Sequence, residues 1–284
     1  MGGARFPLMR FPGFLSKAFT LSYDDGPVWD RNLIEMMTKY GVRGTFNLNS
    51  HRFNFAADDF ADVAAEAREL YLGSGNEVAA HTMGHLNLTS NDSGFGIRSI
   101  IRDRELLEEM FGVIIKGMAY PYGAYNDTVV DMCRLCGVNY CRTVESTGKF
   151  SMPRDWLRLP ATCHHNAPNL MELADRFVNT KPLTEAWRQG PSMFYVWGHT
   201  YEFNDNQNWQ VMEELLKRVT DTDTDTVWYA TNGQIFDYEK AFKSLIYSAN
   251  GEMCYNPTVT DVYLSYYGKD VVVKSGETVD LEKY

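Results

Sequence analysis

Two carboxylates and two histidines stand where the sequence could build a metal site. Asp24 and Asp25 follow a short apolar run and precede a Gly-Pro turn, and His81 and His85 follow a second apolar run. Neighbouring side chains at the end of a strand diverge, so one carboxylate can bind a metal while the other faces a water molecule. Two imidazoles four residues apart lie on one face of a helical turn and can share one cation. One carboxylate with two neutral imidazoles suits Zn²⁺ first, with Co²⁺, Ni²⁺ or Mn²⁺ as alternatives.

Two further clusters could assist a hydrolytic reaction. A Pro-Tyr-Gly turn contains Tyr122, and a Trp-Gly-His-Thr sequence places Trp197 and His199 at the end of another apolar run. A rigid turn can aim a backbone N–H at a developing oxyanion, and a histidine at a strand end can protonate a leaving group. Taken singly, each of the four clusters also fits a surface turn or a packed histidine.

The elements that must position these residues are short strands that alternate with helices. We expect strands at 18–23, 44–48, 77–80, 116–120, 138–142, 193–197 and 227–230. Between the first two, Leu33, Met36, Met37 and Tyr40 recur at helical spacing. Strands separated by helices pair in parallel through right-handed crossovers, so the sequence predicts an α/β fold, a deformed (β/α) barrel of seven parallel strands. Catalytic groups should then lie where the strands end.

The last part of the chain has a different pattern. Residues 255–281 are rich in β-type runs separated by turns, and they contain no histidine. We therefore predict a barrel over residues 1–250 and a small β-rich appendage over residues 251–284. We expect the appendage to pack as an edge or lid on the barrel without supplying catalytic groups.

Composition excludes several classes of function. The chain has 284 residues and a formal net charge of −10, which argues against nucleic-acid binding because a phosphate backbone needs a basic surface. No apolar run approaches the roughly 20 residues that a membrane-spanning helix needs. The first residues lack the apolar core of a signal peptide, so we expect a cytoplasmic protein, or an extracellular or envelope protein if an export signal is missing upstream.

The chain has five cysteines, so at least one must be unpaired within a monomer. Cys133 and Cys136 form a Cys-x-x-Cys sequence within a helical pattern, without a second pair at zinc-finger spacing. We favour buried thiols over a redox pair. The sequence does not indicate an oligomeric state.

Together, the four clusters form an ordered set: Asp-Asp-Gly-Pro, His-Thr-x-x-His, Pro-Tyr-Gly and Gly-His. This set, spread over residues 18–249, resembles the polysaccharide deacetylases, the carbohydrate esterase family four with the NodB homology domain. The resemblance implies a metal-dependent hydrolase that removes acetyl groups from an N- or O-acetylated carbohydrate. It further implies that Asp24 is the general base, that Asp25, His81 and His85 hold one divalent metal ion, and that His199 protonates the departing amine or alkoxide.

The resemblance also assigns roles around this centre, and the sequence departs from the family in places. The backbone N–H of Tyr122 would contact the oxyanion, Thr82 would brace the histidine loop, and Trp197 stands where a leucine usually lines the acetyl pocket. Family members usually carry an arginine that pairs with the general base, at the position that Ala119 occupies here.

The base must therefore either tolerate a higher pKa or recruit another cation. We expect Arg142 or Arg158 to contact Asp24, with Arg158 preferred. The family's aspartate and tryptophan that tune the catalytic histidine are matched only loosely by Asp155-Trp156, and Cys163-His164-His165 could rim the substrate pocket, form a second metal site or be a polar loop.

Two other functions fit the same motifs. The first is hydrolysis of another non-peptide C–N bond, in a cyclic ureide or an amide, which the departures at Ala119 and Trp197 could mark. The second is a catalytically inactive carbohydrate-binding protein that keeps the barrel. Retention of both carboxylates, both metal-site histidines and His199 argues against the inactive protein.

Overall fold

The computed structural model describes residues 7–26, 28–180, 190–221 and 226–284. Its largest sheet has nine strands, all paired in parallel: β2 (Lys17–Asp24), β3 (Gly44–Leu48), β4 (Glu77–Ala80), β5 (Gly117–Ala119), β6 (Tyr140–Ser146), β7 (Leu159–Ala161), β8 (Cys163–His164), β9 (Ser192–His199) and β10 (Val227–Tyr229). The order is β7-β6-β5-β4-β3-β2-β9-β8, and β10 pairs with the first half of β2.

A single short segment closes this sheet into a barrel. β7 pairs with β6 and β8 pairs with β9, and only Thr162 separates the two strands. The Thr162 amide donates to Tyr195 O at 2.8 Å, so the segment bridges both edges of the sheet. The predicted deformed (β/α) barrel is confirmed, but its strand count differs because the segment 159–164 was not predicted.

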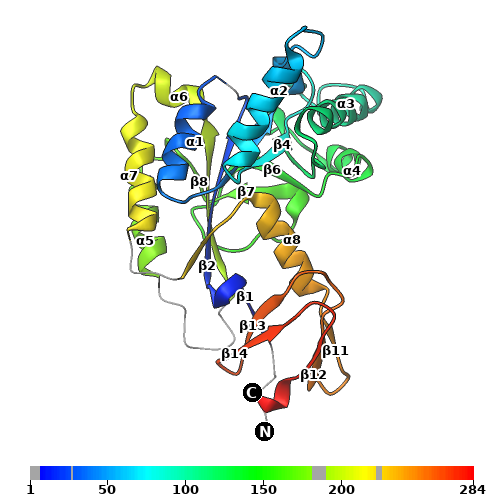
Figure 1. Cartoon of the computed structure of the whole chain (residues 1–284), viewed down its shortest axis with the longest axis vertical. Helices are drawn as coiled ribbons and strands as arrows, with labels where there is room; N and C mark the ends of the chain where they lie inside the picture. The colour runs from blue at the N-terminus through cyan, green and yellow to red at the C-terminus, as the bar shows by residue number, and fades with distance from the viewer. Residues whose placement is uncertain (1–6, 27, 181–189, 222–225) are drawn as a thin grey trace.

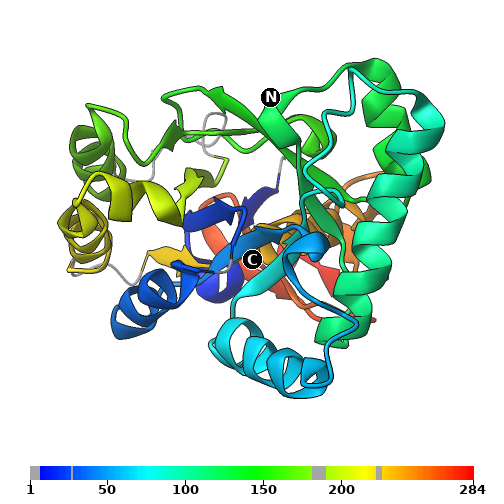
Figure 2. The same cartoon turned by 90° about the horizontal axis from the view of Figure 1, so that it is seen from above.

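Eight helices in the described part of the chain lie around the outside of the strands (Figure 2). They are α1 (Asp30–Lys39), α2 (Phe60–Arg68), α3 (Ser93–Phe111), α4 (Asp127–Leu135), α5 (Leu170–Asn179), α6 (Thr200–Asp205), α7 (Trp209–Thr220) and α8 (Asn232–Lys243). In α1 the predicted stripe packs inward, since Leu33 and Met37 are fully buried. Among the described residues, no helix combines the length and apolar composition needed to cross a bilayer.

Alternation along β2 separates an apolar layer from a polar barrel interior. Phe19, Leu21 and Tyr23 belong to the hydrophobic core that packs under the helices. The intervening residues are polar, and the Thr20 hydroxyl donates to Asn232 Oδ1 at 2.9 Å inside the protein. Because side chains alternate along a strand, Asp24 continues the polar row and faces the barrel interior.

The appendage contains two small antiparallel sheets and includes a strand from the start of the chain. β1 (Leu8–Arg10) pairs with β13 (Val262–Tyr266), which forms a hairpin with β14 (Lys269–Val273). β11 (Ile246–Tyr247), β12 (Met253–Tyr255) and β15 (Thr278–Asp280) form the second sheet. Figure 1 shows both sheets at the end of the barrel where β2 begins, opposite the end where Asp24 lies. They are separate from the nine-stranded sheet, and they lie away from the end where the strands carrying the predicted site finish.

All five cysteines are buried and none forms a disulfide. Cys133 and Cys136, at the end of α4 and just beyond it, belong to the main hydrophobic core. Buried thiols are thus the arrangement that the structure shows.

Candidate functional site

The ends of the parallel strands bring the predicted residues together. β2 ends at Asp24 and β9 ends at His199, and these two residues are direct partners in the sheet. Asp25 follows β2, and His81 follows β4. Carboxyl ends of parallel strands meet at one end of a barrel, which is where catalytic groups lie in this architecture.

Asp25, His81 and His85 form a group that fits a divalent metal. Asp25 Oδ1 lies 3.8 Å from His81 Nε2 and 3.7 Å from His85 Nε2. This oxygen is buried and accepts no hydrogen bond within the described part of the chain, as expected of an atom reserved for a cation. One carboxylate and two imidazoles leave further coordination positions open, which a catalytic site requires.

The second nitrogen of His81 fixes which ring nitrogen can bind the metal. His81 Nδ1 lies 2.9 Å from Ala119 O, and a carbonyl can only accept a hydrogen bond. The proton must therefore sit on Nδ1, so Nε2 turns an unprotonated lone pair toward Asp25. Burial lowers the pKa of His81 despite the nearby Asp24 and Asp25, which favours the neutral ligand form.

The loop that carries the two histidines is not the helical turn that the spacing predicted. Thr82, Gly84 and His85 have φ angles of 63°, 77° and 54°, which a right-handed helix does not contain. The rings still converge, with centroids 4.8 Å apart. Asp25 also has a positive φ, 69°, so strained backbone gathers around this centre.

Hydrogen bonds from neighbouring elements hold this loop in place. Asp103 of α3 is buried and accepts from the amides of His81 and Ser50, at 3.0 and 2.7 Å. The Asn49 amide group donates to the carbonyl oxygens of His81 and Thr82 at 2.7 and 2.9 Å. The Thr82 hydroxyl accepts from Leu86 N at 2.8 Å, so it ties together the two ends of the loop.

Asp24 lies beside the metal group with its own set of partners. Its side chain is almost completely buried, and Asn47 Nδ2 donates to its Oδ1 at 2.8 Å. Arg142 forms an ion pair with its Oδ2, and His81 Nε2 lies 3.9 Å from the same oxygen. Burial alone would raise the pKa of Asp24, but Arg142 and the nearby histidines outweigh it and hold the pKa below its usual range.

The missing arginine is thus replaced from the neighbouring strand. Ala119 of β5 and Arg142 of β6 are direct partners in the sheet. The guanidinium that pairs with Asp24 therefore comes from the adjacent strand, at the same height in the barrel as the expected arginine. The preference for Arg158 was wrong, because Arg158 pairs with Asp155 and Asp127 near the surface. Arg142 is buried within the barrel, and its guanidinium lies 4.1 Å from the centre of the Trp197 ring.

The loose match at Asp155-Trp156 does not lie at the site. Trp156 Nε1 donates to Glu239 Oε2 at 2.6 Å, and Asp155 accepts from Leu157 N at 2.9 Å. The carboxylate near His199 is Glu202 of α6 instead, which the sequence analysis missed. Its Oε2 lies 3.6 Å from His199 Nδ1. The His-x-x-Glu spacing was visible in the sequence, but only the sharp turn from β9 into α6 brings the two side chains together.

The two ring nitrogens of His199 face different carboxylates, Nδ1 toward Glu202 and Nε2 toward Asp25. Its Nε2 lies 4.0 Å from Asp25 Oδ2. Burial lowers the pKa of His199, but Glu202 and the two aspartates outweigh it and raise the pKa above its usual value. The imidazolium form is thereby favoured, which suits a proton donor.

Tyr122 and Trp197 border this centre in different ways. Tyr122 is 67% exposed, has a φ of 58°, and packs its ring edge-on against His85 with centroids 4.4 Å apart. Trp197 is buried and packs between Arg142 and His164. Tyr122 can therefore contact a substrate that arrives from solvent, while Trp197 forms part of the buried wall of the site. Pro27 of the first motif lies outside the described residues.

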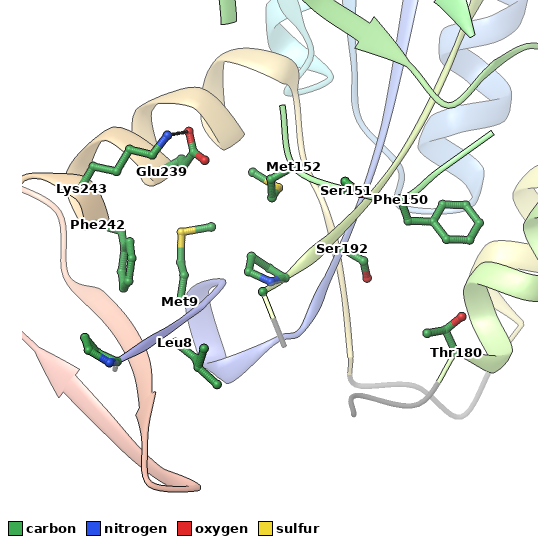
Figure 3. A pocket seen from close by; sticks show the side chains of 13 residues that line it. Leu8, Met9, Phe150, Ser151, Met152, Thr180, Ser192, Glu239, Phe242 and Lys243 are labelled. Atoms are coloured by element: carbon green, nitrogen blue, oxygen red, sulfur yellow. Dashed lines mark hydrogen bonds and ion pairs between the residues drawn. The ribbon is translucent and has the colours of Figure 1, made fainter. Parts of the chain in front are cut away.

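A pocket of about 580 Å³ lies at the other end of the barrel, between β1, α8 and the start of β9 (Figure 3). Met9, Met152 and Phe242 contribute apolar surface, and Lys243 Nζ pairs with Glu239 Oε2 at 2.8 Å. Its described lining contains no histidine, aspartate or cysteine. The chemistry-bearing residues therefore gather at the opposite end, where the strands finish.

Comparison with known proteins agrees with the motifs. The family model of the polysaccharide deacetylases matches residues 14–141, which include the first three motifs. This match confirms the resemblance that the ordered motifs predicted. No curated protein matches the sequence.

Solved structures share the fold at low identity. The peptidoglycan deacetylase PdaC from Bacillus subtilis is 19% identical, with a TM-score of 0.52 over 81% of this chain and 94% of that chain. A family 4 acetyl xylan esterase from Clostridium thermocellum, in complex with a cobalt ion, is 16% identical, with a TM-score of 0.51 over 79% and 92%. A pseudoenzyme of the same family from Bacillus anthracis is 12% identical, with a TM-score of 0.51 over 81% and 68%. At these identities the likeness shows the fold, and the residues of the site must carry the function.

Proposed function

From the resemblance to polysaccharide deacetylases, we propose that this chain is a divalent-metal-dependent deacetylase that acts on an N- or O-acetylated carbohydrate. One observation carries the proposal. At one end of the barrel, Asp25, His81 and His85 converge within 4.8 Å of one another, while Asp24 stands beside them with a separate cation of its own. Two adjacent carboxylates thus have different partners and can perform different tasks.

Asp25, His81 and His85 would hold the metal, and Zn²⁺ suits one carboxylate and two neutral imidazoles. A divalent cation there would supply Lewis-acid chemistry, which polarises an acyl carbonyl and makes water a stronger acid. The orphaned Asp25 Oδ1 and the Nδ1–H form of His81 both support this assignment.

Asp24 would act as the general base. Arg142 and Asn47 keep its carboxylate ionised and fix its orientation, so it can accept a proton from the attacking water. The water oxygen adds to the acetyl carbon, and Tyr122 can offer its backbone N–H to the oxyanion that forms.

His199 would complete the reaction at the leaving group. As imidazolium, it donates a proton to the departing amine nitrogen or alkoxide oxygen when the bond to the acetyl carbon breaks. His199 and Asp24 are paired residues on adjacent strands, so the acid and the base lie side by side at the same end of the barrel. Acetate and the deacetylated sugar are the products.

Two alternatives can be weighed against specific residues. Hydrolysis of a different C–N bond was suggested by the departures at Ala119 and Trp197. Arg142 restores the cation beside Asp24, so the departure at Ala119 no longer supports that alternative. Trp197 remains a departure at the acetyl pocket. An inactive protein with this fold has a precedent in the Bacillus anthracis pseudoenzyme, yet this chain keeps every group that the proposed reaction needs.

The test is hydrolysis of acetylated substrates by the purified protein loaded in turn with Zn²⁺, Co²⁺, Ni²⁺ or Mn²⁺. Chito-oligosaccharides test N-deacetylation, and acetylated xylan tests O-deacetylation. Release of acetate that requires both metal and Asp24 is expected. Absence of release from every acetylated sugar with every metal would reject the proposal and favour a binding protein or another amide hydrolase.

A further inference from the structure

A second group of histidines surrounds a carboxylate next to the proposed metal centre. Glu202 Oε2 lies 3.2 Å from His164 Nε2, 3.0 Å from His165 Nε2 and 3.6 Å from His199 Nδ1. His164 ends β8, His165 follows it, and Glu202 lies in the first turn of α6. We call His164, His165 and Glu202 the imidazole cage. The proposed reaction leaves this group without a role.

The imidazole cage contains ligand types that could bind a metal, but the hydrogen bonds argue against it. His164 Nδ1 accepts a hydrogen bond from the backbone amide of Asn166 at 3.1 Å. An acceptor nitrogen carries no proton, so the proton of the neutral ring sits on Nε2. That nitrogen therefore carries the proton, lies 3.2 Å from Glu202 Oε2 and has no lone pair for a metal. His81 is the reverse case, because its Nδ1 faces a carbonyl oxygen.

The surroundings hold the imidazole cage rigidly. His165 is buried, and its ring stacks on Phe203 at 4.1 Å between centroids and on Tyr23 at 5.7 Å. Its ring lies directly over Gly198, where an added Cβ would come within 2.0 Å of His165 Nδ1. The backbone amide of His199 donates to Glu202 Oε2 at 3.3 Å, which anchors the carboxylate to the strand that carries His199.

His199 Nδ1 is buried and has no hydrogen-bond partner among the residues that the structure describes. The 3.6 Å to Glu202 Oε2 is longer than a hydrogen bond, but catalytic hydrogen bonds are often long until substrate binds. His199 Nε2 points toward Asp25 and the metal centre.

We propose that Glu202 is a positioning residue for His199. It accepts the Nδ1–H of His199 and thereby presents Nε2–H to the leaving group, while the His199 backbone amide anchors the carboxylate and His164 and His165 border it. After Nε2 gives up its proton, the neutral ring keeps its proton on Nδ1, bonded to Glu202. The inference rests on the proposed deacetylase function and adds the group that orients its acid.

The first test compares leaving groups in Glu202→Gln and Glu202→Asp. A sugar amine must be protonated to depart, whereas nitrophenolate leaves without a proton. Loss of the orienting carboxylate should lower kcat on chito-oligosaccharides by about 10²- to 10⁴-fold with little change in KM. Hydrolysis of para-nitrophenyl acetate should fall less than about tenfold. The shorter Glu202→Asp should recover part of the loss, because it keeps the charge.

Equal losses on both substrates, or no loss on either, would overturn the proposal. So would loss of bound Zn²⁺ from Glu202→Gln, since Glu202 would then be a metal ligand. Metal content measured on both purified proteins decides that point.

The second test does not need activity. The ¹⁵N chemical shifts of His199 in the Zn²⁺-loaded protein, assigned with a His199→Gln variant, report which ring nitrogen carries the proton. At a pH above the pKa of His199, where the ring is neutral, Nδ1–H is expected in the wild type, and a mixture of both tautomers is expected in Glu202→Gln. A wild-type ring with its proton on Nε2 alone would overturn the positioning role. If the shifts agree but no acetylated substrate is hydrolysed, the deacetylase function fails while the positioning role stands.

Discussion

The two histidine–carboxylate groups at this end of the barrel have the same composition and opposite chemistry. Each contains two histidines and one carboxylate, and the ligand atoms in each lie within 4.8 Å of one another. In the metal group, His81 Nδ1 faces a carbonyl oxygen, which leaves Nε2 as a lone pair. In the imidazole cage, His164 Nδ1 faces a backbone amide, which makes Nε2 a donor.

Residue type and spacing therefore do not define a metal site by themselves. The partner of the second ring nitrogen selects the tautomer, and the tautomer decides between a metal ligand and a hydrogen-bond donor. The carboxylates differ in the same way. Asp25 Oδ1 is left without a donor, whereas Glu202 Oε2 accepts from the His199 backbone amide and has the Nε2 atoms of His164 and His165 at 3.2 and 3.0 Å.

The sharpest test of this comparison is to remove one histidine from each group. His85→Ala removes a ligand, so metal content should fall from about one ion per chain to near zero, with loss of all activity. His164→Ala is the matched control and should keep its metal, because His164 binds no ion. Elemental analysis after equilibration with limiting Zn²⁺ gives both values. Metal loss in His164→Ala would mean that the two groups share one function.

The next largest effect should separate the base from the metal. Asp24→Asn cannot accept the proton of water, so kcat should fall by about 10²- to 10⁴-fold while metal content stays unchanged. Acetate release and metal analysis are measured on the same preparation. Turnover at the wild-type rate would show that Asp24 is no base, and a loss of metal would make it a ligand.

Arg142 should matter in a way that Arg158 does not. Its cation lowers the pKa of buried Asp24, so Arg142→Ala should raise that pKa and move the acidic limb of the kcat/KM profile to higher pH. The unpaired buried carboxylate should also cost about 3–5 kcal/mol of folding free energy. Arg158→Ala is the control, and its surface pairs should change stability by less than about 1 kcal/mol. An unmoved acidic limb in Arg142→Ala would show that other groups keep Asp24 ionised.

The sequence predicted the features that depend on neighbouring residues in the chain. The predicted strands 18–23 and 193–197 place Asp24 and His199 at or just after strand ends, and the segment after strand 77–80 carries His81 and His85, as the structure has them. The barrel followed from the alternation of strands and helices. The family match over residues 14–141 stops before β9, so His199 rests on its motif and its position in the sheet.

The features that the sequence did not predict depend on contacts between distant segments. Arg142 replaces the expected arginine only because the register of β5 and β6 places it opposite Ala119. β7 and β8 were missed because they are three and two residues long and gain their partners only when the barrel closes. β1 pairs with β13 across most of the chain, which no local pattern indicates. The helical turn at His81 failed because three residues there adopt positive φ.

The smallest expected effect tests how the imidazole cage is held. Gly198 has no side chain, and a methyl group there would meet the ring of His165 at 2.0 Å from Nδ1. Gly198→Ala should therefore push His165 away from β9 at a cost of about 1–3 kcal/mol in folding free energy, as overpacking in a core does. Glu202 would lose its contact with His165 but keep its contact with His164. We therefore expect kcat on chito-oligosaccharides to fall only about tenfold, far less than in Asp24→Asn. Metal content should not change, since His81 and His85 lie on another loop.

Gly84→Ala is a useful contrast, because nothing lies within 4 Å of its added Cβ and only its φ of 77° resists the change. A Gly198→Ala protein with wild-type stability and turnover would show that His165 can move freely, and the cage would then not be the rigid support that its packing indicates.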